Sequence, residues 1–154
     1  MAEKKYGNCV VPAPISKVPL EGYTWESLYA HEGQINADCT ISLHYITETF
    51  EEGPPHKHNA QQVMAFVGGD MKNIRDFDAE IEIVLGEEME VQTITSPSVV
   101  TIPAGLLHCP LRFKRLGKPV IFLELAFERS YQRVIDSVPE GTEFESSYSK
   151  QIES

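Results

Sequence analysis

The middle of the chain is a series of short segments in which apolar and polar residues alternate. From Thr40 onward, Ile41, Leu43 and Tyr45 share one face of an extended backbone, and Ser42 and His44 share the other. Similar or wholly apolar runs follow at 56–70, 79–85, 89–95, 99–102 and 119–127, with turn residues between them. Many short, evenly spaced strands predict an all-β sandwich or barrel.

The two ends of the chain do not share this pattern. Residues 1–37 are irregular and proline-containing, and they predict an N-terminal arm with a few edge strands. Residues 38–128 form the predicted barrel, and 129–154 a C-terminal tail with a short helix near 130–138. Because 154 residues are the size of one compact domain, we expect one domain overall.

Composition narrows the range of partners. The formal net charge of −10 argues against nucleic acid as a partner, because binding phosphates needs clustered Lys and Arg. No segment approaches the roughly 20 apolar residues that cross a bilayer, so we expect no membrane contact and a cytoplasmic location. Three cysteines without tight spacing predict reduced thiols rather than a disulfide framework.

Three histidines carry the candidate chemistry. His56 and His58 are separated by one residue, so on an extended backbone both imidazoles project from the same face. Two histidines in a loop are also commonly just solvated, but a Pro103-x-Gly105 turn delivers His108 onto another strand. We therefore predict that two strands present three imidazoles to one divalent metal ion, for which Mn, Fe, Ni and Zn all qualify. Cys109 is an alternative ligand, although adjacent strand residues point to opposite faces.

With these spacings the sequence resembles the cupin superfamily. Its two motifs are G-x5-H-x-H-x(3,4)-E-x6-G and G-x5-P-x-G-x2-H-x3-N. The matching positions are His56, His58, Gly69, Pro103, Gly105 and His108. The departures are Phe50 and Pro97 for the motif glycines, Gln62 for the glutamate and Arg112 for the asparagine. The resemblance covers about 38–127 and implies a double-stranded β-helix, or jelly roll, with the metal inside one open end.

Gln62 is the departure that bears on chemistry. Three neutral imidazoles and an amide leave a divalent site near +2, whereas a carboxylate ligand would leave it near +1. Such a site favours an anionic ligand, such as a carboxylate or enolate, and suits iron-dependent oxygen activation less well. The alternative is that Gln62 lies behind the ligands and holds a water molecule or a histidine.

Several other residues are candidates for the site. Glu124 interrupts an apolar strand, where a buried carboxylate can serve as acid or base, and Arg112 could pair with a substrate carboxylate or lie on the surface. Met64 and Phe66 share a face with Gln62, so they either line the pocket or belong to the core. His44 is either near the pocket or a structural residue. Glu80 and Glu82 alternate with apolar residues and are predicted to face solvent.

Three function classes follow. The first is a metal-dependent enzyme that moves a proton on a small, anionic carboxylate or dicarbonyl compound, as an isomerase, epimerase, lyase or decarboxylase. An iron-dependent dioxygenase on the same site is the second, and a non-catalytic binding or sensing module is the third. We also expect a homodimer, by analogy with other cupins and because exposed sheet edges are usually covered.

Overall fold

Strands supply the buried residues of the hydrophobic core cluster. The computed structural model describes residues 4–18 and 22–128. In this part of the chain one 3-10 turn, η1 (Gly7–Cys9), precedes ten strands. The strands are β1 (Ile15–Lys17), β2 (Glu26–Ala30), β3 (Thr40–Ile46), β4 (Phe50–Glu52), β5 (Gln62–Gly68), β6 (Ala79–Leu85), β7 (Glu90–Ile94), β8 (Ser98–Ile102), β9 (His108–Leu116) and β10 (Val120–Ala126).

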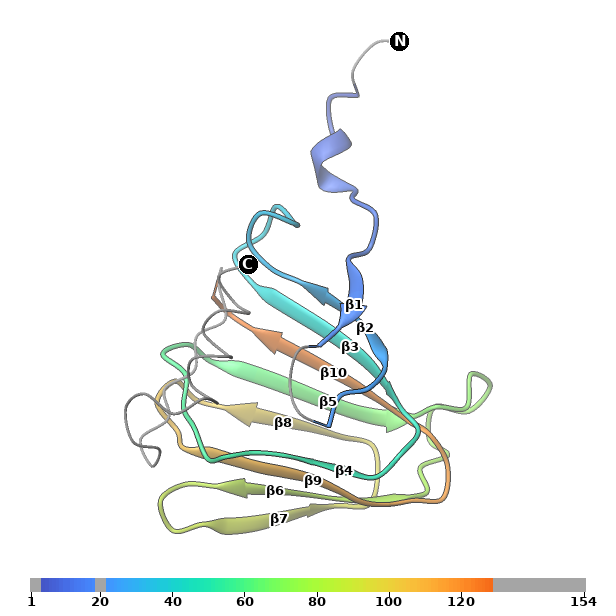
Figure 1. Ribbon diagram of the computed structural model, residues 1–154, viewed down its shortest axis with the longest axis vertical. Helices are drawn as coiled ribbons and strands as arrows, with labels where there is room; N and C mark the ends of the chain where they lie inside the picture. The colour runs from blue at the N-terminus through green and yellow to red at the C-terminus, as the bar shows by residue number, and fades with distance from the viewer. Residues whose placement is uncertain (1–3, 19–21, 129–154) are drawn as a thin grey trace.

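Two antiparallel sheets face each other. The larger has the order β1-β2-β3-β10-β5-β8, and the smaller has the order β4-β9-β6-β7. Figure 1 shows the six strands of the larger sheet side by side, with the smaller sheet below them. Strand β10, the last of the described strands, lies between β3 and β5, so segments far apart in the sequence pair at the centre of the larger sheet. The all-β class predicted from the alternating pattern is confirmed.

Most predicted strands are present, including the one onto which the Pro-x-Gly turn was predicted to deliver His108, and β4 is additional. Strand β4 forms where a break was expected, and β9 extends to Leu116 beyond the predicted turn at 103–108. Pro110 hid the alternation in β9, in which Leu111 and Phe113 are buried and Arg112 and Lys114 are not. The predicted C-terminal helix lies outside the described residues.

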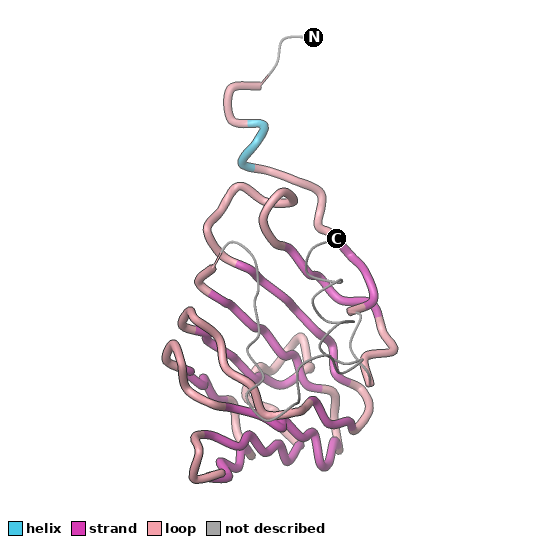
Figure 2. The backbone as a smooth tube through the Cα atoms, turned by 60° about the vertical axis from the view of Figure 1, so that its left-hand side comes forward, coloured by secondary structure: helices cyan, strands magenta, loops and turns pink. Residues whose placement is uncertain are grey.

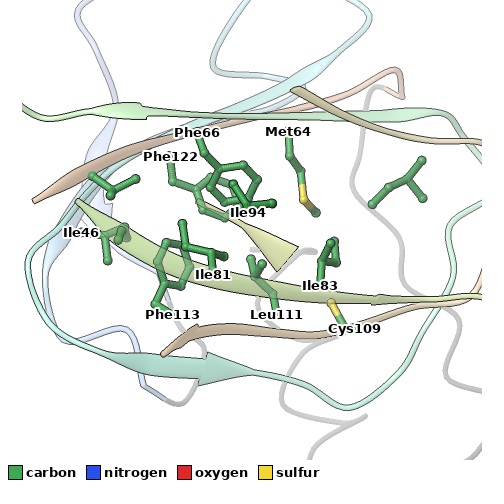
Figure 3. Close-up of a cluster of buried hydrophobic side chains, with 13 residues drawn as sticks. Ile46, Met64, Phe66, Ile81, Ile83, Ile94, Cys109, Leu111, Phe113 and Phe122 are labelled. Atoms are coloured by element: carbon green, nitrogen blue, oxygen red, sulfur yellow. The ribbon is translucent and has the colours of Figure 1, made fainter. Parts of the chain in front are cut away.

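The interior is apolar at one end. Phenylalanines from three strands pack ring against ring, with centroids 4.8 Å apart for Phe66 and Phe122 and 5.9 Å for Phe113 and Phe122. Figure 3 shows Phe66 and Phe122 of the larger sheet facing Ile81, Leu111 and Phe113 of the smaller sheet. Burial of such a side chain contributes about 1.5–3 kcal/mol, so this cluster holds the two sheets together.

The other end of the interior is polar. On β3 the buried face carries Thr40, Ser42 and His44 before Ile46, whereas Tyr45 on the opposite face is exposed. The alternation in this strand was predicted correctly, but its polar side turns inward. Sheets usually bury the apolar face, so an inward polar face marks a region built for something other than packing.

Two irregularities lie where the motifs fall. A β-bulge separates the pairs Ile83–Leu111 and Leu85–His108, so Cys109 and Pro110 stand opposite one residue of β6. Cys109 has a positive φ of 83°. At Gly69 a Cβ atom would come 2.8 Å from the carbonyl oxygen of Pro119, which explains why the motif glycine is needed there.

The N-terminal arm stands apart from the sheets. Figure 2 shows its single helical turn well away from the two layers, connected through β1 to the edge of the larger sheet. Exposed apolar side chains along it include Tyr6, Val10 and Ile15. Within the described residues there is no helix long and apolar enough to cross a membrane.

Candidate metal centre

The three predicted histidines come together inside the fold. The candidate ligand nitrogens of His56, His58 and His108 all lie within 4.8 Å of one another, and all three side chains are buried. The ring centroids of His56 and His108 are 4.4 Å apart, and that of His58 is 5.0 Å from His56 and 5.1 Å from His108. A group of three buried imidazoles at this spacing can hold a metal ion.

Backbone hydrogen bonds tie the two motif segments to each other. The amides of His56 and His108 each donate to the other residue's carbonyl oxygen at 2.9 Å, which forms an isolated antiparallel bridge. The amide of Gly105, whose φ is +83°, donates to the carbonyl of His58 at 2.8 Å. The predicted Pro-x-Gly turn is therefore what places His108 beside the first two histidines.

Hydrogen bonds also fix the tautomers of two imidazoles. Nδ1 of His56 lies 2.9 Å from the carbonyl oxygen of Pro54, and Nδ1 of His108 lies 2.9 Å from that of Leu106. A carbonyl only accepts, so in both rings Nδ1 carries the proton and donates it. The lone pair is then on Nε2, which is the form a metal ion requires, and the ring orientation is set in advance.

Gln62 is fully buried at the start of β5, opposite Ile102 and Ala126. Its Nε2 donates to Oε1 of Glu124. Its Oε1 is buried and has no hydrogen-bond partner among the described residues. Leaving a buried carbonyl oxygen without a partner costs about 1–3 kcal/mol, so this atom is suited to a ligand or an ion.

Glu124 has a role that its position in an apolar strand did not reveal. It lies opposite Ser42 on β3 and Met64 on β5, half-buried, and it accepts the hydrogen bond from Gln62. Since a carboxylate accepts only, this contact fixes which end of the Gln62 amide is nitrogen and directs its oxygen away from Glu124.

Arg112 is not brought to the histidines. Its guanidinium contacts Glu51 at 3.1 Å and Glu82 at 3.7 Å on the side of β9 opposite buried Leu111 and Phe113. Glu82 also pairs with Lys114 at 2.9 Å, and these contacts hold the pKa of the Glu82 carboxyl below its usual range. The predicted outward position of Glu82 is therefore correct, and Arg112 has the surface role that was the alternative for it.

The predicted pocket residues divide between the two ends of the interior. Met64 and Phe66 belong to the apolar cluster, and Cys109 is buried in the same cluster. The metal-ligating group within the described residues contains the three histidines and not Cys109. His44 is buried, with its Nδ1 2.6 Å from Oγ of Ser27 and its ring against those of Tyr23 and Phe122. Burial lowers the pKa of His44 to about 4, against an opposing effect of Glu52, so its imidazole is neutral at pH 7.

Sequence reasoning missed three buried polar residues, namely Tyr23, Ser27 and Glu52. The hydroxyl of Tyr23 donates to Oε2 of Glu52 at 2.8 Å. Burial, and then the charge of Glu52, raise the pKa of Tyr23 well above its usual value. The sequence carried one signal for Glu52, because it lies four residues before His56 in the segment that leads into the first motif.

The fold is an all-β double-stranded β-helix, and its interior contains three convergent buried histidines able to hold a metal ion. No protein-family model matches the sequence, and no curated protein matches it. Among solved structures, the polyketide cyclase RemF from Streptomyces resistomycificus is 13% identical with a TM-score of 0.56, over 96% of this chain and 98% of that one. An RmlC-like cupin from Shewanella frigidimarina is 12% identical with a TM-score of 0.50, over 78% and 86%.

At such low identity these similarities concern the fold. The chain has the double-stranded β-helix of the RmlC-like cupins, in one small domain with a buried three-histidine group able to hold a metal ion. The resemblance inferred from the two motifs is thereby confirmed.

Proposed function

We propose that this cupin binds one divalent metal ion and acts on a small anionic carboxylate or dicarbonyl compound by moving a proton. The products would be those of an isomerase, a lyase or a decarboxylase. The observation that carries the proposal is the convergence of the buried imidazoles of His56, His58 and His108. When bound, the metal ion supplies Lewis acidity to a carbonyl or carboxylate oxygen.

Gln62 is the proposed fourth ligand. Its Oε1 is buried without a hydrogen-bond partner in the described residues, and its amide orientation is set by Glu124. Three neutral imidazoles and a neutral amide leave the positive charge of the ion unneutralised, which favours an anionic substrate. Glu124, which accepts a hydrogen bond from Gln62, offsets part of that positive charge without being a ligand itself. The region around the proposed ligands therefore contains one carboxylate, although Gln62 replaces the glutamate of the motif.

Metal analysis of untagged protein tests the site. We expect about one equivalent of a divalent metal in the wild-type protein and a loss of stoichiometric metal in His56→Ala. Gln62→Leu, which removes the oxygen and keeps the volume, should weaken metal binding by about 10–100-fold or more. If the wild-type protein takes up no stoichiometric metal and His56→Ala changes nothing, the proposal fails.

Hydrogen exchange in D2O tests the reaction. The metal-loaded protein is incubated with a panel of 2-oxo acids and 1,3-dicarbonyl compounds, and deuterium incorporation next to the carbonyl is followed by proton NMR. We expect faster incorporation with at least one compound, without consumption of oxygen. An absence of any acceleration across the panel contradicts proton transfer.

The iron-dependent dioxygenase remains the second candidate, since the same three histidines can hold iron. An oxygen electrode with iron-loaded protein and the same dicarbonyl panel, extended with phenolic compounds, distinguishes the two. Oxygen uptake coupled to product formation would reverse the ranking. Binding of a panel compound with neither exchange nor oxygen uptake would instead favour the binding or sensing module.

We also propose that the protein is a homodimer. Strand β1 pairs only with β2 within the described residues, its own Ile15 is exposed, and the arm before it exposes Tyr6 and Val10. An exposed edge next to apolar side chains is usually covered by a partner. Light scattering of the full chain should give twice the mass of 17.3 kDa, and a monomer would contradict this.

A further inference from the structure

Four buried polar side chains form two hydrogen-bonded pairs beside the phenylalanine cluster. Tyr23 donates to Glu52 at 2.8 Å, and Ser27 and His44 are 2.6 Å apart. The rings of Tyr23 and His44 have centroids 5.3 Å apart, so the pairs lie side by side. They come from β2, β3, β4 and the segment before β2, and none is a predicted metal ligand. Burying four polar groups together is costly without a function, because each must find a partner.

The protonation states of these groups complement each other. The phenol of Tyr23 stays protonated, because burial and the charges of Glu52 and Glu124 raise its pKa. The imidazole of His44 stays neutral, because burial lowers its pKa to about 4. Neither ring therefore carries a charge at pH 7. The titratable groups that act on these two rings are Glu52, Glu124 and Cys109.

This group adjoins the metal centre from two directions. Glu124, which is close enough to raise the pKa of Tyr23, accepts the hydrogen bond from Gln62. Glu52 pairs through β4 with Leu111 on β9, three residues after His108. From Glu52 the chain continues to Pro54, whose carbonyl accepts the hydrogen bond from Nδ1 of His56. The Tyr23–Glu52 pair is therefore connected through the electrostatic effect of Glu124 to Gln62, the proposed fourth ligand, and through four positions of chain to His56.

We propose that Glu52 is the catalytic base of this site and that Tyr23, His44 and Ser27 are its positioning residues. The inference rests on the proposed function. In the step, a C–H bond next to the carbonyl of the substrate breaks, the proton joins a carboxylate oxygen of Glu52, and the electron pair remains on the substrate as an enolate. After the acid proton of Glu52 exchanges with solvent, Glu52 protonates the carbon again, which in D2O places deuterium there. Tyr23 keeps its own proton throughout and holds the carboxylate in place.

Glu124 is the competing candidate for this role. Its Oε1 accepts the hydrogen bond from Gln62, so its contact serves the orientation of the amide. The carboxylate of Glu52 instead accepts a hydrogen bond from the phenol of Tyr23 at 2.8 Å. We therefore assign base chemistry to Glu52 and orientation of Gln62 to Glu124.

Adjacent glutamates on β4 provide a matched pair of variants. Glu52 is buried, whereas Glu51 is exposed and pairs with Arg112 on the outer face. Using the panel compound that exchanges in the wild-type protein, Glu52→Gln should lower the rate of deuterium incorporation by about 10²–10⁴-fold at unchanged metal content. Glu51→Gln should leave it unchanged. Equal rates in Glu52→Gln and the wild-type protein would overturn the assignment and leave the proposed function intact.

Chemical rescue separates a base from a structural residue. Added formate should restore part of the exchange in Glu52→Ala, because a small carboxylate can occupy the space of the missing one, and it should do nothing for Glu124→Gln. Failure of rescue with metal still bound would count against Glu52 as the base. If the wild-type protein exchanges no compound, the proposed function and this inference fall together, and that result is distinct from the others.

Tyr23 is tested without any substrate. In protein labelled with ¹³C at tyrosine Cζ, the signal that disappears in Tyr23→Phe should keep its position up to about pH 10, where a free phenol ionises. In exchange assays, Tyr23→Phe should lower the rate by about tenfold with a bound metal. A Tyr23 signal that titrates like a free phenol would overturn its role as a permanently protonated donor.

Discussion

The two ends of the interior are built from the same strands, but one end is packed with apolar side chains and the other carries polar ones. On β5 the inward residues pass from Gln62 to Met64 and Phe66, and on β10 they pass from Phe122 to Glu124. At one end phenylalanines pack against each other, and at the other the amide of Gln62 donates to the carboxylate of Glu124. Each strand thus contributes to stability with one half and to chemistry with the other, so a single side chain is expected to affect mainly one of the two properties.

The largest expected effect is a loss of stability when a side chain of the apolar end is removed. Phe66→Ala removes a fully buried ring that packs against Phe113 and Phe122, and it should lower the free energy of unfolding by about 3–5 kcal/mol. Chemical denaturation measures this, while the metal content of the protein that remains folded should not change. Val99→Ala, at an exposed site on β8, is the control and should change stability by less than about 0.5 kcal/mol.

The second prediction concerns how the free energy of unfolding depends on pH through the buried imidazole of His44. The pKa of His44 is about 4 in the folded chain and 6.5 in the unfolded chain, so between these values only the unfolded chain binds the extra proton. Stability contributed by neutral His44 is present above pH 6.5 and is lost as the pH falls through this window, to a total of about 3 kcal/mol. Denaturation of the metal-free protein should show this loss in the wild-type chain.

His44→Gln is the matched variant, because an amide can still meet Ser27 but does not titrate. Its stability should fall less steeply between pH 6.5 and pH 4 than that of the wild-type chain. His31→Gln, on the outside of the fold near Tyr29, controls for the removal of one imidazole. Parallel pH curves for the wild-type chain and His44→Gln would contradict the assignment.

Removal of one histidine should affect the polar end alone. His108→Ala is expected to weaken metal binding by more than about 100-fold, since even residues behind the ligands account for 10–100-fold. The rise in melting temperature that metal gives the wild-type protein should disappear, whereas the midpoint of the metal-free protein should move far less than in Phe66→Ala. Calorimetric titration measures the first and thermal unfolding the second. A variant that kept the metal-dependent rise would exclude His108 as a ligand.

The smallest effect is expected at Arg112. Its ion pairs with Glu51 and Glu82 lie on the outer face, where solvent screens them. Arg112→Ala should therefore leave thermal unfolding, metal content and deuterium exchange without measurable change. A large loss of exchange would return Arg112 to the site, against the position that the structure gives it.

The parts of the site that depend on residues close together in the sequence could be predicted from it. The one-residue separation of His56 and His58 and the turn at Pro103–Gly105 were enough to predict the three-histidine group, because both depend on neighbours along the chain. The inward face of β3 was beyond reach, since alternation shows that a strand has two faces but not which one is buried. A polar residue on the buried face looks the same in sequence as one on the surface.

Long-range pairs explain what the sequence could not predict. Tyr23 meets Glu52 across 29 positions, and Gln62 meets Glu124 across 62, so no local pattern announces either contact. Arg112 was ambiguous for a related reason. It stands four residues after His108, but the bulge at Cys109 and Pro110 shifts the alternation of β9 between them.

The two backbone hydrogen bonds between His56 and His108 require that both amides become exposed to solvent in the same opening event. These two amides protect each other across 52 positions, so neither can reach solvent unless the two segments separate. We expect both amides to exchange with deuterated water at one common rate, and both to slow by the same factor when metal is added. The rate of that shared opening, read by NMR, would give the free energy that keeps the two motifs joined.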